Sequence, residues 1–247
     1  MLFSCLHLAT PKVSILFIIR MIVFSFTLFG SEDKYCKGMI RNVEEIQKRF
    51  PEAKTYIFCG NDIPDSILST LESFPSVQLF KTNQIGLINK IYRYLPIDDP
   101  DVDVCIVRDA DSRVYDRDET SIRDFLKSDK LCQIIRDHKV HKVAILGGMV
   151  SFKKGCLLTN MRELVGHFIT EELDNKPFEF EDDQNFLKKY IYPLIIRNAL
   201  IQDEYDQPFE PPEFHTKISK PRVFPHFVGQ VYLFNEKGEE FTVCGGP

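Results

Sequence analysis

Short apolar runs of strand length alternate along the chain with stretches that have helical spacing. The apolar runs are residues 21–29, 54–59, 77–80, 102–107, 131–135 and 143–146, and the helical stretches are 37–49, 63–74, 85–94, 120–128 and 182–196. Near-continuous apolar strands are typical of a parallel sheet buried on both faces. The alternation therefore predicts an α/β fold with a central, mostly parallel sheet flanked by helices. Such sheets bind ligands beyond the carboxyl ends of their strands.

Towards the end of the chain, the stretch 182–196 has the pattern of an amphipathic helix. We expect one face of it to point inward, namely Phe186, Leu187, Tyr190, Ile191 and Leu194. The prolines of 207–225 predict a surface loop, and 227–234 predicts a last strand. The basic pair at 153–154 indicates a solvated turn.

The N-terminal segment has two interpretations. Residues 13–30 are almost all apolar, as in a signal segment or a membrane anchor. Arg20 interrupts the run, however, and the part before it is too short to cross a bilayer. We expect residues 1–20 to be an extension, with Met21 a candidate start of translation, and residues 21–247 to form one domain. The anchor is the weaker interpretation.

The composition fits a protein with one sizeable core, because 44% of the 247 residues are hydrophobic and 27% are charged. A formal net charge of −5 argues against a nucleic-acid partner, which usually meets a basic face. The cysteines are odd in number and none has CxxC spacing, so we expect thiols in a reducing, cytoplasmic compartment rather than a zinc site or disulfides. They are Cys5, Cys36, Cys59, Cys105, Cys132, Cys156 and Cys244.

Asp109 and Asp111 directly follow the apolar run 102–107, where an open α/β sheet places its ligands. Their i, i+2 spacing allows both carboxylates to point at one ion. A hard cation such as Mn²⁺ or Mg²⁺ takes oxygen ligands and bridges to phosphate oxygens. The alternative is a solvated turn in which Asp111 accepts backbone N–H bonds. The buried strand before the pair favours the metal site.

A second group of polar residues, Asp183 and Gln184, begins the helical stretch 182–196. Acidic residues at that place usually cap a helix and complement its dipole. The alternative interpretation is functional and places them beside the anomeric carbon of a bound sugar, where positive charge develops during transfer.

A third feature is the pair Gly147-Gly148, which follows the apolar run 143–146. It indicates either a close approach of the backbone to a ligand or a tight turn. Just upstream, Asp137 has a side chain suited to sugar hydroxyls. His138 and His141 are expected to be structural, as most single histidines are.

Together these segments resemble a GT-A type, glycosyltransferase-like family of bacteria and large viruses, whose members are mostly uncharacterised. The matching segments cover nearly everything from residue 21 to 232. They are SFTLFG (25–30), KYCKGMIRN (34–42), DPDVDVCIVRDADSR (99–113), IIRDHKVHKVAILGGM (134–149), DDQNFLKKYIYPL (182–194) and FVGQVY (227–232).

The resemblance implies transfer of a sugar from a UDP- or GDP-sugar to a glycan, lipid or protein acceptor, with Mn²⁺ or Mg²⁺. Asp109 and Asp111 would hold the metal, and Asp183 and Gln184 would face the reacting sugar. The donor would be bound by Phe26, Thr27, Leu28, Phe29, Gly30, Arg108, Asp137, Gly147 and Gly148. No nucleic acid is expected as a partner, and membrane association is not expected.

Two positions depart from the family pattern. Val150-Ser151 stands where the family has a Trp, and Gln202 stands where many GT-A enzymes have a metal-binding His. The second departure either weakens the metal site or leaves Asp203 to complete it.

Two other functions share the same motifs. A haloacid-dehalogenase-type phosphatase also has a strand ending in DxD, but Ser112-Arg113 follow here and several strands precede. The other is a GT-A protein that binds a nucleotide sugar without transferring it.

Overall fold

The computed structural model describes residues 19–174 and 176–242. An eight-stranded sheet has the order β3-β2-β1-β4-β6-β5-β7-β8. Its strands are β1 (Ile22–Leu28), β2 (Lys54–Cys59), β3 (Val77–Lys81), β4 (Val104–Val107), β5 (Cys132–Arg136), β6 (Val150–Lys153), β7 (Ala199–Asp203) and β8 (His215–Thr216). Only β6 runs antiparallel to its neighbours in this sheet. The predicted α/β fold with a mostly parallel sheet is confirmed.

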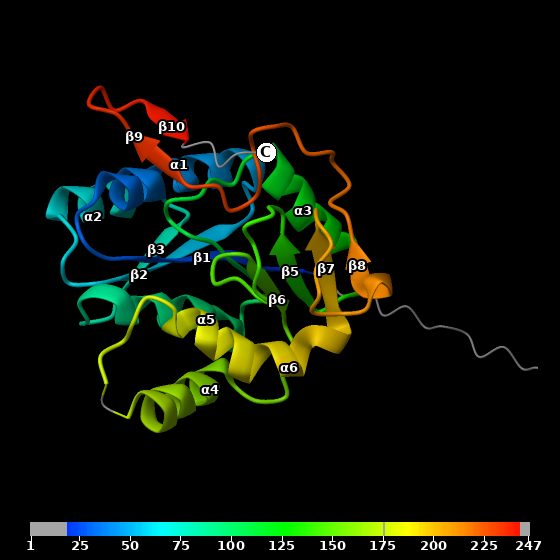
Figure 1. Cartoon of the computed structure of the whole chain (residues 1–247). Coiled ribbons are helices and arrows are strands. Elements are labelled where there is room, and N and C mark those ends of the chain that lie inside the picture. Colours follow the sequence, from blue (N-terminus) through cyan, green and yellow to red (C-terminus); the bar gives the residue numbers. More distant parts are fainter. Residues whose placement is uncertain (1–18, 175, 243–247) are drawn as a thin grey trace, which may run out of the picture.

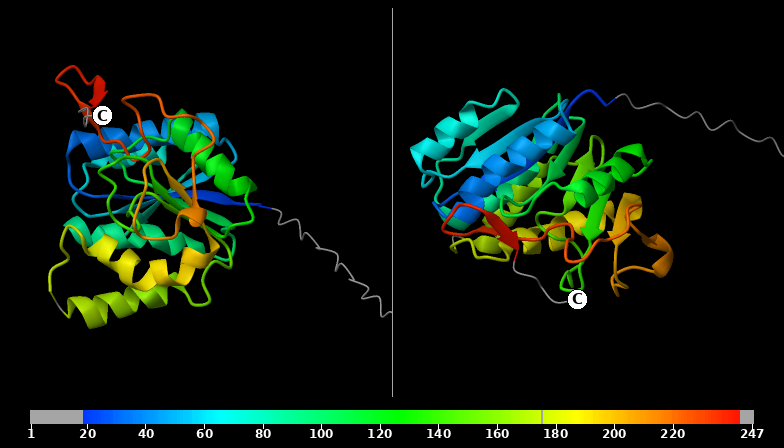
Figure 2. Two further views of the ribbon diagram at one scale, coloured as in Figure 1. Left: turned by 45° about the vertical axis from the view of Figure 1, so that its right-hand side comes forward. Right: turned by 90° about the horizontal axis from the view of Figure 1, so that it is seen from above.

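Helices cover both faces of the sheet (Figures 1 and 2). One layer contains α1 (Asp33–Arg49), α2 (Asp65–Glu72) and α3 (Asp116–Lys127). The other contains the 3₁₀ helix η1 (Gly86–Asp98), α4 (Met161–His167) with its π-helical continuation η2 (Phe168–Leu173), and the helical run α5 (Asp182–Phe186), η3 (Leu187–Ile191), α6 (Tyr192–Ile195) and η4 (Ile196–Asn198). A short 3₁₀ turn η5 (Pro212–Phe214) precedes β8, and β9 (Tyr232–Phe234) pairs with β10 (Glu240–Thr242) as a separate hairpin.

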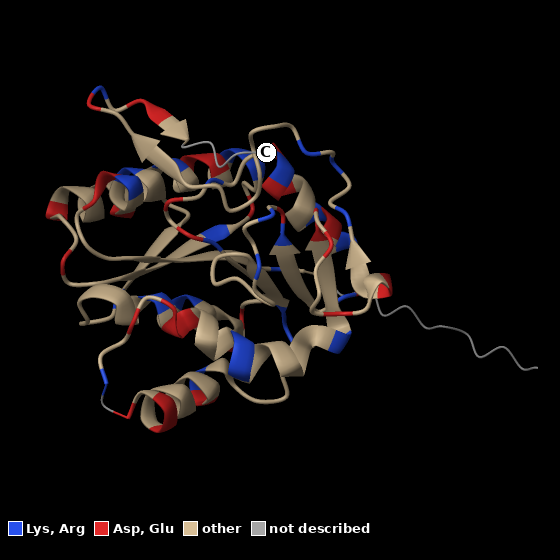
Figure 3. Ribbon diagram, viewed as in Figure 1, with Lys and Arg blue, Asp and Glu red and all other residues tan. Residues whose placement is uncertain are grey.

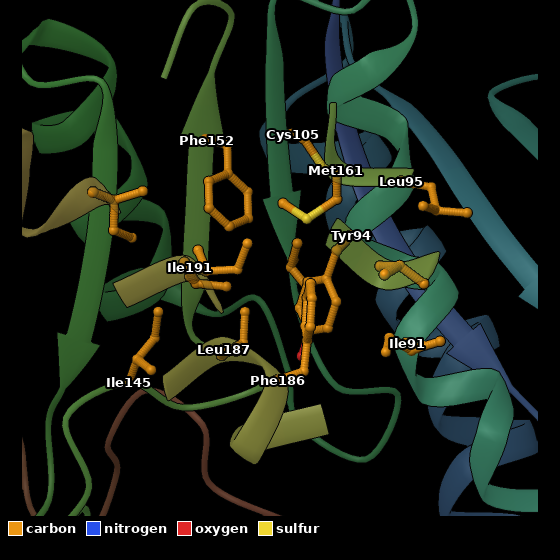
Figure 4. Packing of buried hydrophobic residues seen from close by; sticks show 14 of the residues in the cluster. Ile91, Tyr94, Leu95, Cys105, Ile145, Phe152, Met161, Phe186, Leu187 and Ile191 are labelled. Carbon is orange, nitrogen blue, oxygen red and sulfur yellow. The ribbon is translucent and has the colours of Figure 1, made fainter. Parts of the chain in front are cut away.

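The alternation of side chains along β1 divides the core in two. Phe24, Phe26 and Leu28 point toward α1 and pack with its Met39 and Val43. The residues between them point to the opposite face, because successive side chains of a strand alternate. The second core lies there. In it, Tyr94 of η1 packs against Phe186 of α5, and residues of β4, β6 and α4 belong to the same cluster (Figure 4).

The run from α5 to η4 confirms the predicted helix, with one shift of its inward face. Phe186, Leu187 and Ile191 are buried as expected, but Leu194 is 53% exposed and Ile195 is buried instead. The segment η3 is π-helical, and each π turn contains one residue more than an α turn. The extra residue rotates the later positions, so the inward position moves from 194 to 195.

The prediction of a strand at 143–146 is wrong. That stretch is irregular, and the strand lies at β6, after the glycine pair. The expected solvated turn at 153–154 is wrong for Lys153, which is buried and donates from Nζ to Phe125 O (2.9 Å) and Ser128 O (2.8 Å) at the end of α3. The helix formed by α4 and η2 was not predicted from the pattern.

The apolar segment 21–29 forms the interior strand β1, hydrogen-bonded on both sides to β2 and β4. Residues 1–18, which make up most of the predicted extension, lie outside the described part of the chain. In the described ranges, no helix is both long and apolar enough to cross a membrane. Cys36, Cys59, Cys105, Cys132 and Cys156 are free thiols, while Cys5 and Cys244 fall outside the described ranges.

Charged side chains of both signs are interspersed along α1, α3 and α4 (Figure 3). Several form i, i+4 pairs on the helix surface, such as Lys37 with Asp33 (2.7 Å) and Arg123 with Glu119 (2.8 Å). Exposed pairs of this kind contribute only about 0.3–0.5 kcal/mol each. These surface pairs therefore contribute little to the stability of this fold.

Candidate functional site

A cavity of about 450 Å³ opens at the edge of the sheet where β1 and β4 end and β6 begins. The lining residues come from these strand ends, from η1, from the start of α5 and from the segment before β9. They are Thr27, Phe29, Glu32, Tyr35, Leu87, Lys90, Arg93, Asp109, Ala110, Asp111, His141, Leu146, Gly147, Gly148, Met149, Phe180, Asp183, Gln184, Gly229 and Val231. The structure thus brings together Asp109 and Asp111 (the DxD pair), the glycine pair, and Asp183 with Gln184.

Hydrogen bonds to main-chain groups hold the turn Asp109-Ala110-Asp111 (the DxD turn) in place. Asn42 of α1 donates from Nδ2 to the carbonyl oxygens of Ala110 (3.2 Å) and Ser112 (2.8 Å). The backbone N–H of Tyr232 donates to Asp111 O at 2.8 Å. These bonds use main-chain groups of the turn, so the carboxylates of Asp109 and Asp111 stay directed to the cavity that they line.

The charges of the two DxD aspartates are unequally compensated. Asp109 forms an ion pair with Arg93 through Oδ1, and its side chain is 43% exposed. Burial and then the nearby Asp109 raise the pKa of Asp111 to about 6, although Lys34 and Arg113 act in the opposite direction. A raised carboxyl pKa means that the negative charge is not fully stabilised by its surroundings. A cation between the two carboxylates would stabilise it.

Asp183 lies 1% exposed in the same cavity and is held by two cations. Its Oδ2 is 2.7 Å from Arg93 Nη2, and its Oδ1 is 2.5 Å from Lys90 Nζ. Helix α5 shows no side-chain cap bond. The neighbouring Asp182 instead accepts from the backbone N–H of Glu179 (2.7 Å). Asp183 is therefore a buried, ion-paired residue of the cavity and not a helix cap.

The geometry of η1 explains why Lys90 and Arg93 act together. In a 3₁₀ helix, side chains three residues apart lie in one row. Leu87, Lys90 and Arg93 form such a row along the cavity, whereas Ile91 and Tyr94 form the row that packs into the core. Arg93 spans the cavity wall, with Nη1 on Asp109 and Nη2 on Asp183. It thereby fixes the two carboxylates relative to each other.

The glycine pair leaves room for these side chains. A β-carbon on Gly147 would fall 2.6 Å from Asp183 Oδ2, and one on Gly148 would overlap the Asp109 carboxylate. Tyr94 also donates from its hydroxyl to Gly147 O at 3.2 Å. Any side chain at position 147 or 148 would therefore collide with the residues that line the site. The pair precedes β6, whose first residues meet the ligand edge because this strand is antiparallel.

Only part of the segment Phe26–Gly30 reaches the cavity. Thr27 and Phe29 line it, whereas Phe26 and Leu28 lie in the core under α1, because strand residues alternate between faces. Gly30 adopts φ +73° in the turn to α1 and does not line the cavity. Phe29 and Tyr35 stack at 6.4 Å between ring centroids, and together they form an aromatic wall.

Two of the charged residues that were expected to bind the donor lie elsewhere, each paired with an opposite charge. Arg108 is 1% exposed and donates two hydrogen bonds to Asp118. Asp137 accepts from Arg117 Nε at 2.8 Å. Neither lines the cavity. Their sequence neighbourhood suggested a ligand, but the charge of each side chain is already neutralised inside the fold.

Asp203, expected as the third metal ligand, also lies outside the cavity. Both of its carboxylate oxygens accept from Arg136, at 2.6 and 2.7 Å. Glu210 and His215 share this cluster. The guanidinium of Arg136 thus occupies the position of the cation among these acids, and the geometry does not join Asp203 to Asp109 and Asp111.

Sequence reasoning missed Lys90, Arg93 and His141 as residues of the site. The two cations lie on a stretch that was predicted to be an ordinary helix, in which charged residues are usually solvated. A period of three in Leu87, Lys90 and Arg93 was the available signal.

Several solved structures of similar fold are glycosyltransferases, and one is a 4-diphosphocytidyl-2C-methyl-D-erythritol synthase. One is involved in the glycosylation of the major capsid of PBCV-1 (TM-score 0.49, 14% identity, covering 74% of this chain and 81% of that one). Another is the galactosyltransferase LgtC with donor and acceptor sugar analogs (0.46, 13%, 73% of each chain). A third is the mannosyltransferase PcManGT from Pyrobaculum calidifontis with GDP-Man and Mn²⁺ (0.48, 14%, 76% and 56%).

No protein-family model matches the chain, and no curated protein sequence matches it. At such low identities and TM-scores, these likenesses concern the arrangement of the chain alone.

Proposed function

We propose that this protein is a metal-dependent glycosyltransferase, which moves a sugar from a UDP- or GDP-sugar to a hydroxyl of a glycan, lipid or protein. The observation that carries the proposal is one constellation. Asp109, Asp111 and Asp183 line a single cavity, and Arg93 joins Asp109 to Asp183. A metal site and a carboxylate beside the reacting sugar must be adjacent in such an enzyme, and three carboxylates that line one cavity meet that requirement.

The donor set suits Mn²⁺ or Mg²⁺, which prefer oxygen ligands. Carboxylates outnumber cationic side chains along the cavity, and the raised pKa of Asp111 indicates charge that a cation would stabilise. Arg93 binds Asp109 Oδ1, so Asp109 Oδ2, which lies against the backbone of Gly148, would be the oxygen that holds the ion together with Asp111. When bound, the ion would neutralise negative charge on the departing diphosphate.

The remaining walls suit the other parts of a nucleotide sugar. Phe29 and Tyr35 offer aromatic surface to the base, next to Thr27 at the end of β1. Gln184 Oε1 is buried without a hydrogen-bond partner among the described residues. An unpaired buried carbonyl is costly, and a sugar hydroxyl would satisfy it.

Asp183 is the residue expected to oppose positive charge at the anomeric carbon. Two cations flank it, and each of them contacts one of its two carboxylate oxygens. It therefore suits electrostatic stabilisation and the binding of hydroxyls better than proton abstraction. Arg93 and Lys90 keep its position fixed before the substrate arrives, so little reorganisation is needed during the reaction.

A thermal-shift experiment tests the proposal. The full chain is heated with UDP, GDP or CDP, each with and without Mn²⁺, and the melting temperature is recorded. We expect one nucleotide to raise it only when Mn²⁺ is present, and Asp111→Asn to abolish that shift. Asp101→Asn is the matched control, because Asp101 is exposed and lies at the other end of β4.

The rival functions give different results. A phosphatase would be stabilised by a phosphate mimic such as vanadate and would respond little to nucleotides. A non-catalytic binder would show the Mn²⁺-dependent shift, yet would neither hydrolyse nor transfer the sugar of the nucleotide sugar over long incubation. Stabilisation by nucleotide that is equal in wild type and Asp111→Asn would overturn the assignment of the metal site.

A further inference from the structure

His141 belongs to the irregular segment between β5 and β6 and lines the same cavity as Asp183 and the glycine pair. Its side chain is largely buried, and the whole residue is 8% exposed. Most buried histidines only fill space. Because this one lies at the cavity wall, the protonation of its two ring nitrogens determines which ligand atoms it can bind.

The turn that carries His141 is closed by hydrogen bonds. The backbone N–H of His141 donates to His138 O at 2.9 Å, and Gln207 donates from Nε2 to His141 O at 3.2 Å. The ring packs edge-on against His138 and against Phe227, with centroid separations of 5.9 and 5.6 Å. These contacts hold the imidazole in one orientation.

A hydrogen bond within the same turn determines which ring nitrogen of His141 carries the proton. The backbone N–H of His138 donates to His141 Nδ1 at 3.2 Å, so Nδ1 must offer its lone pair. In a neutral imidazole the proton then resides on Nε2. No hydrogen bond among the described residues involves this Nε2. Burial, with smaller effects of His138 and Arg222, lowers the pKa of His141 to about 4, so the ring is neutral at neutral pH.

A neutral N–H donor fixed in this way recognises a particular kind of atom. It cannot coordinate a metal through Nε2, because that nitrogen carries the proton. It adds no positive charge to attract a diphosphate. An oxygen acceptor fits it, and a hydroxyl of the sugar is the acceptor expected there, because His141 lines the same cavity as Asp183 and the glycine pair. The charged donors of the cavity, Lys90 and Arg93, are already bound to Asp183 and Asp109.

We infer that His141 is a specificity residue, which donates a hydrogen bond from Nε2 to a hydroxyl of the donor sugar. This inference rests on the proposed function, since it needs a nucleotide sugar in the cavity. It assigns to His141 the recognition of the sugar and not of the nucleotide.

Two substitutions separate this role from a structural one. In His141→Asn, the side-chain carbonyl can replace Nδ1 in the turn, but nothing reaches the position of Nε2. In His141→Gln, the amide nitrogen can replace the Nε2 donor, while the acceptor for the His138 N–H is lost. A structural role therefore predicts that Asn is the better replacement, and recognition of the sugar predicts that Gln is.

Calorimetric titration in Mn²⁺ measures the difference. The wild-type chain and both variants are titrated with UDP and UDP-galactose, and with GDP and GDP-mannose. For the pair that binds, we expect His141→Asn to lose roughly 3- to 10-fold in affinity for the nucleotide sugar and none for the free nucleotide, which corresponds to one hydrogen bond. His141→Gln should retain most of the difference between the two ligands.

The outcomes are separable. If His141→Asn binds the nucleotide sugar as tightly as wild type does, the inference fails while the proposed function stands. An equal loss for free nucleotide and nucleotide sugar would place the contact on the nucleotide part and would also overturn it. If the wild-type chain binds none of these ligands, the proposed function fails first, and the role of His141 fails with it.

Discussion

A β-carbon on Gly148 would lie within 3.0 Å of both carboxylate oxygens of Asp109. The backbone of the segment before β6 therefore rests directly against a side chain that follows β4. Asp109 is held from the other side by Arg93. Any side chain at 148 must displace one of these groups, so the metal site that we propose depends on a glycine that binds nothing itself.

Gly148→Ala should consequently abolish the Mn²⁺-dependent rise in melting temperature produced by nucleotide, because the methyl group would push the Asp109 carboxylate out of place. Gly166→Ala is the matched control, since a β-carbon at that position in α4 would have nothing within 4 Å. The control should be slightly more stable than wild type, by about 0.5–1 kcal/mol for a helical Gly-to-Ala change. A Gly148→Ala protein that keeps its nucleotide response would show that the contact is not needed.

Asp183→Asn should lower turnover by about 10²–10³-fold, because the negative charge that opposes positive charge on the sugar is removed. It should also lower the free energy of unfolding by on the order of 3 kcal/mol, since two cations lose their partner in a buried place. Donor affinity measured on the folded protein separates the two effects. Asp182→Asn serves as control and should cost at most about 1 kcal/mol with near-normal turnover. Rapid transfer by a folded Asp183→Asn protein would remove Asp183 from the reaction.

Acid should destabilise the protein through His141. The pKa of this side chain is lowered to about 4, from 6.5, chiefly by burial. Below pH 6.5 His141 binds a proton in the unfolded chain, whereas in the folded chain it remains neutral down to about pH 4. The free energy of unfolding therefore falls as the pH drops through this window. The full effect is up to about 3 kcal/mol.

Carboxylates titrate in the same range, so the measurement is a comparison of denaturant unfolding at pH 7, 6, 5 and 4 between wild type and His141→Asn. The variant should lose less stability on acidification than wild type. His167→Asn, which alters an exposed histidine at the end of α4, should follow the wild-type curve. Parallel curves for wild type and His141→Asn would contradict the assignment.

A chain that begins at Met21 should be soluble and within about 1 kcal/mol of the full chain in stability. It keeps all of β1 and the bond from the Met21 N–H to Asp103 Oδ2 (3.1 Å), and it loses only the bond from Arg20 and the packing of Ile19, among the described residues. Chemical denaturation of both chains measures the difference. A chain that begins at Phe24 should not fold, because it lacks two buried residues of an interior strand. Aggregation of the Met21 chain would show that the extension is part of the fold.

Five strands of the sheet were predictable because they lie in largely apolar runs, whereas β7, which ends in Gln202 and Asp203, and the two-residue β8 were not predicted. Strands β1, β2, β3, β4 and β5 all coincide with predicted runs to within two residues at each end. The strand β6 was predicted one segment too early, since Val143–Leu146 is entirely apolar whereas Val150–Lys153 contains Ser151 and Lys153. The glycine pair between the two runs does not indicate which of them pairs. Only pairing with β4 and β5 decides it.

The site was predictable where position along a strand determines it. Asp109 and Asp111 follow β4, and the structure places both at the cavity. Arg108 and Asp137 have equally suggestive neighbours, but Asp118 and Arg117 neutralise them inside the fold. Such pairings join residues 10 and 20 positions apart, and no local sequence pattern predicts them. For the same reason Arg93 could not be connected with Asp183, which lies 90 positions away.

The reversed direction of β6 has a consequence for how this protein can change in length. Because β6 enters the sheet from the ligand edge, the segment 137–149 that leads into it shapes the cavity through His141, Gly147 and Gly148. The segment 154–160 that leaves it emerges at the opposite edge, among the turns 99–103 and 128–131. Insertions or tags at 154–160 should thus be tolerated without loss of ligand binding, whereas even a one-residue insertion at 142–148 should move the glycine pair away from Asp109. Related chains that diverge in substrate are then expected to vary in length before β6 and not after it.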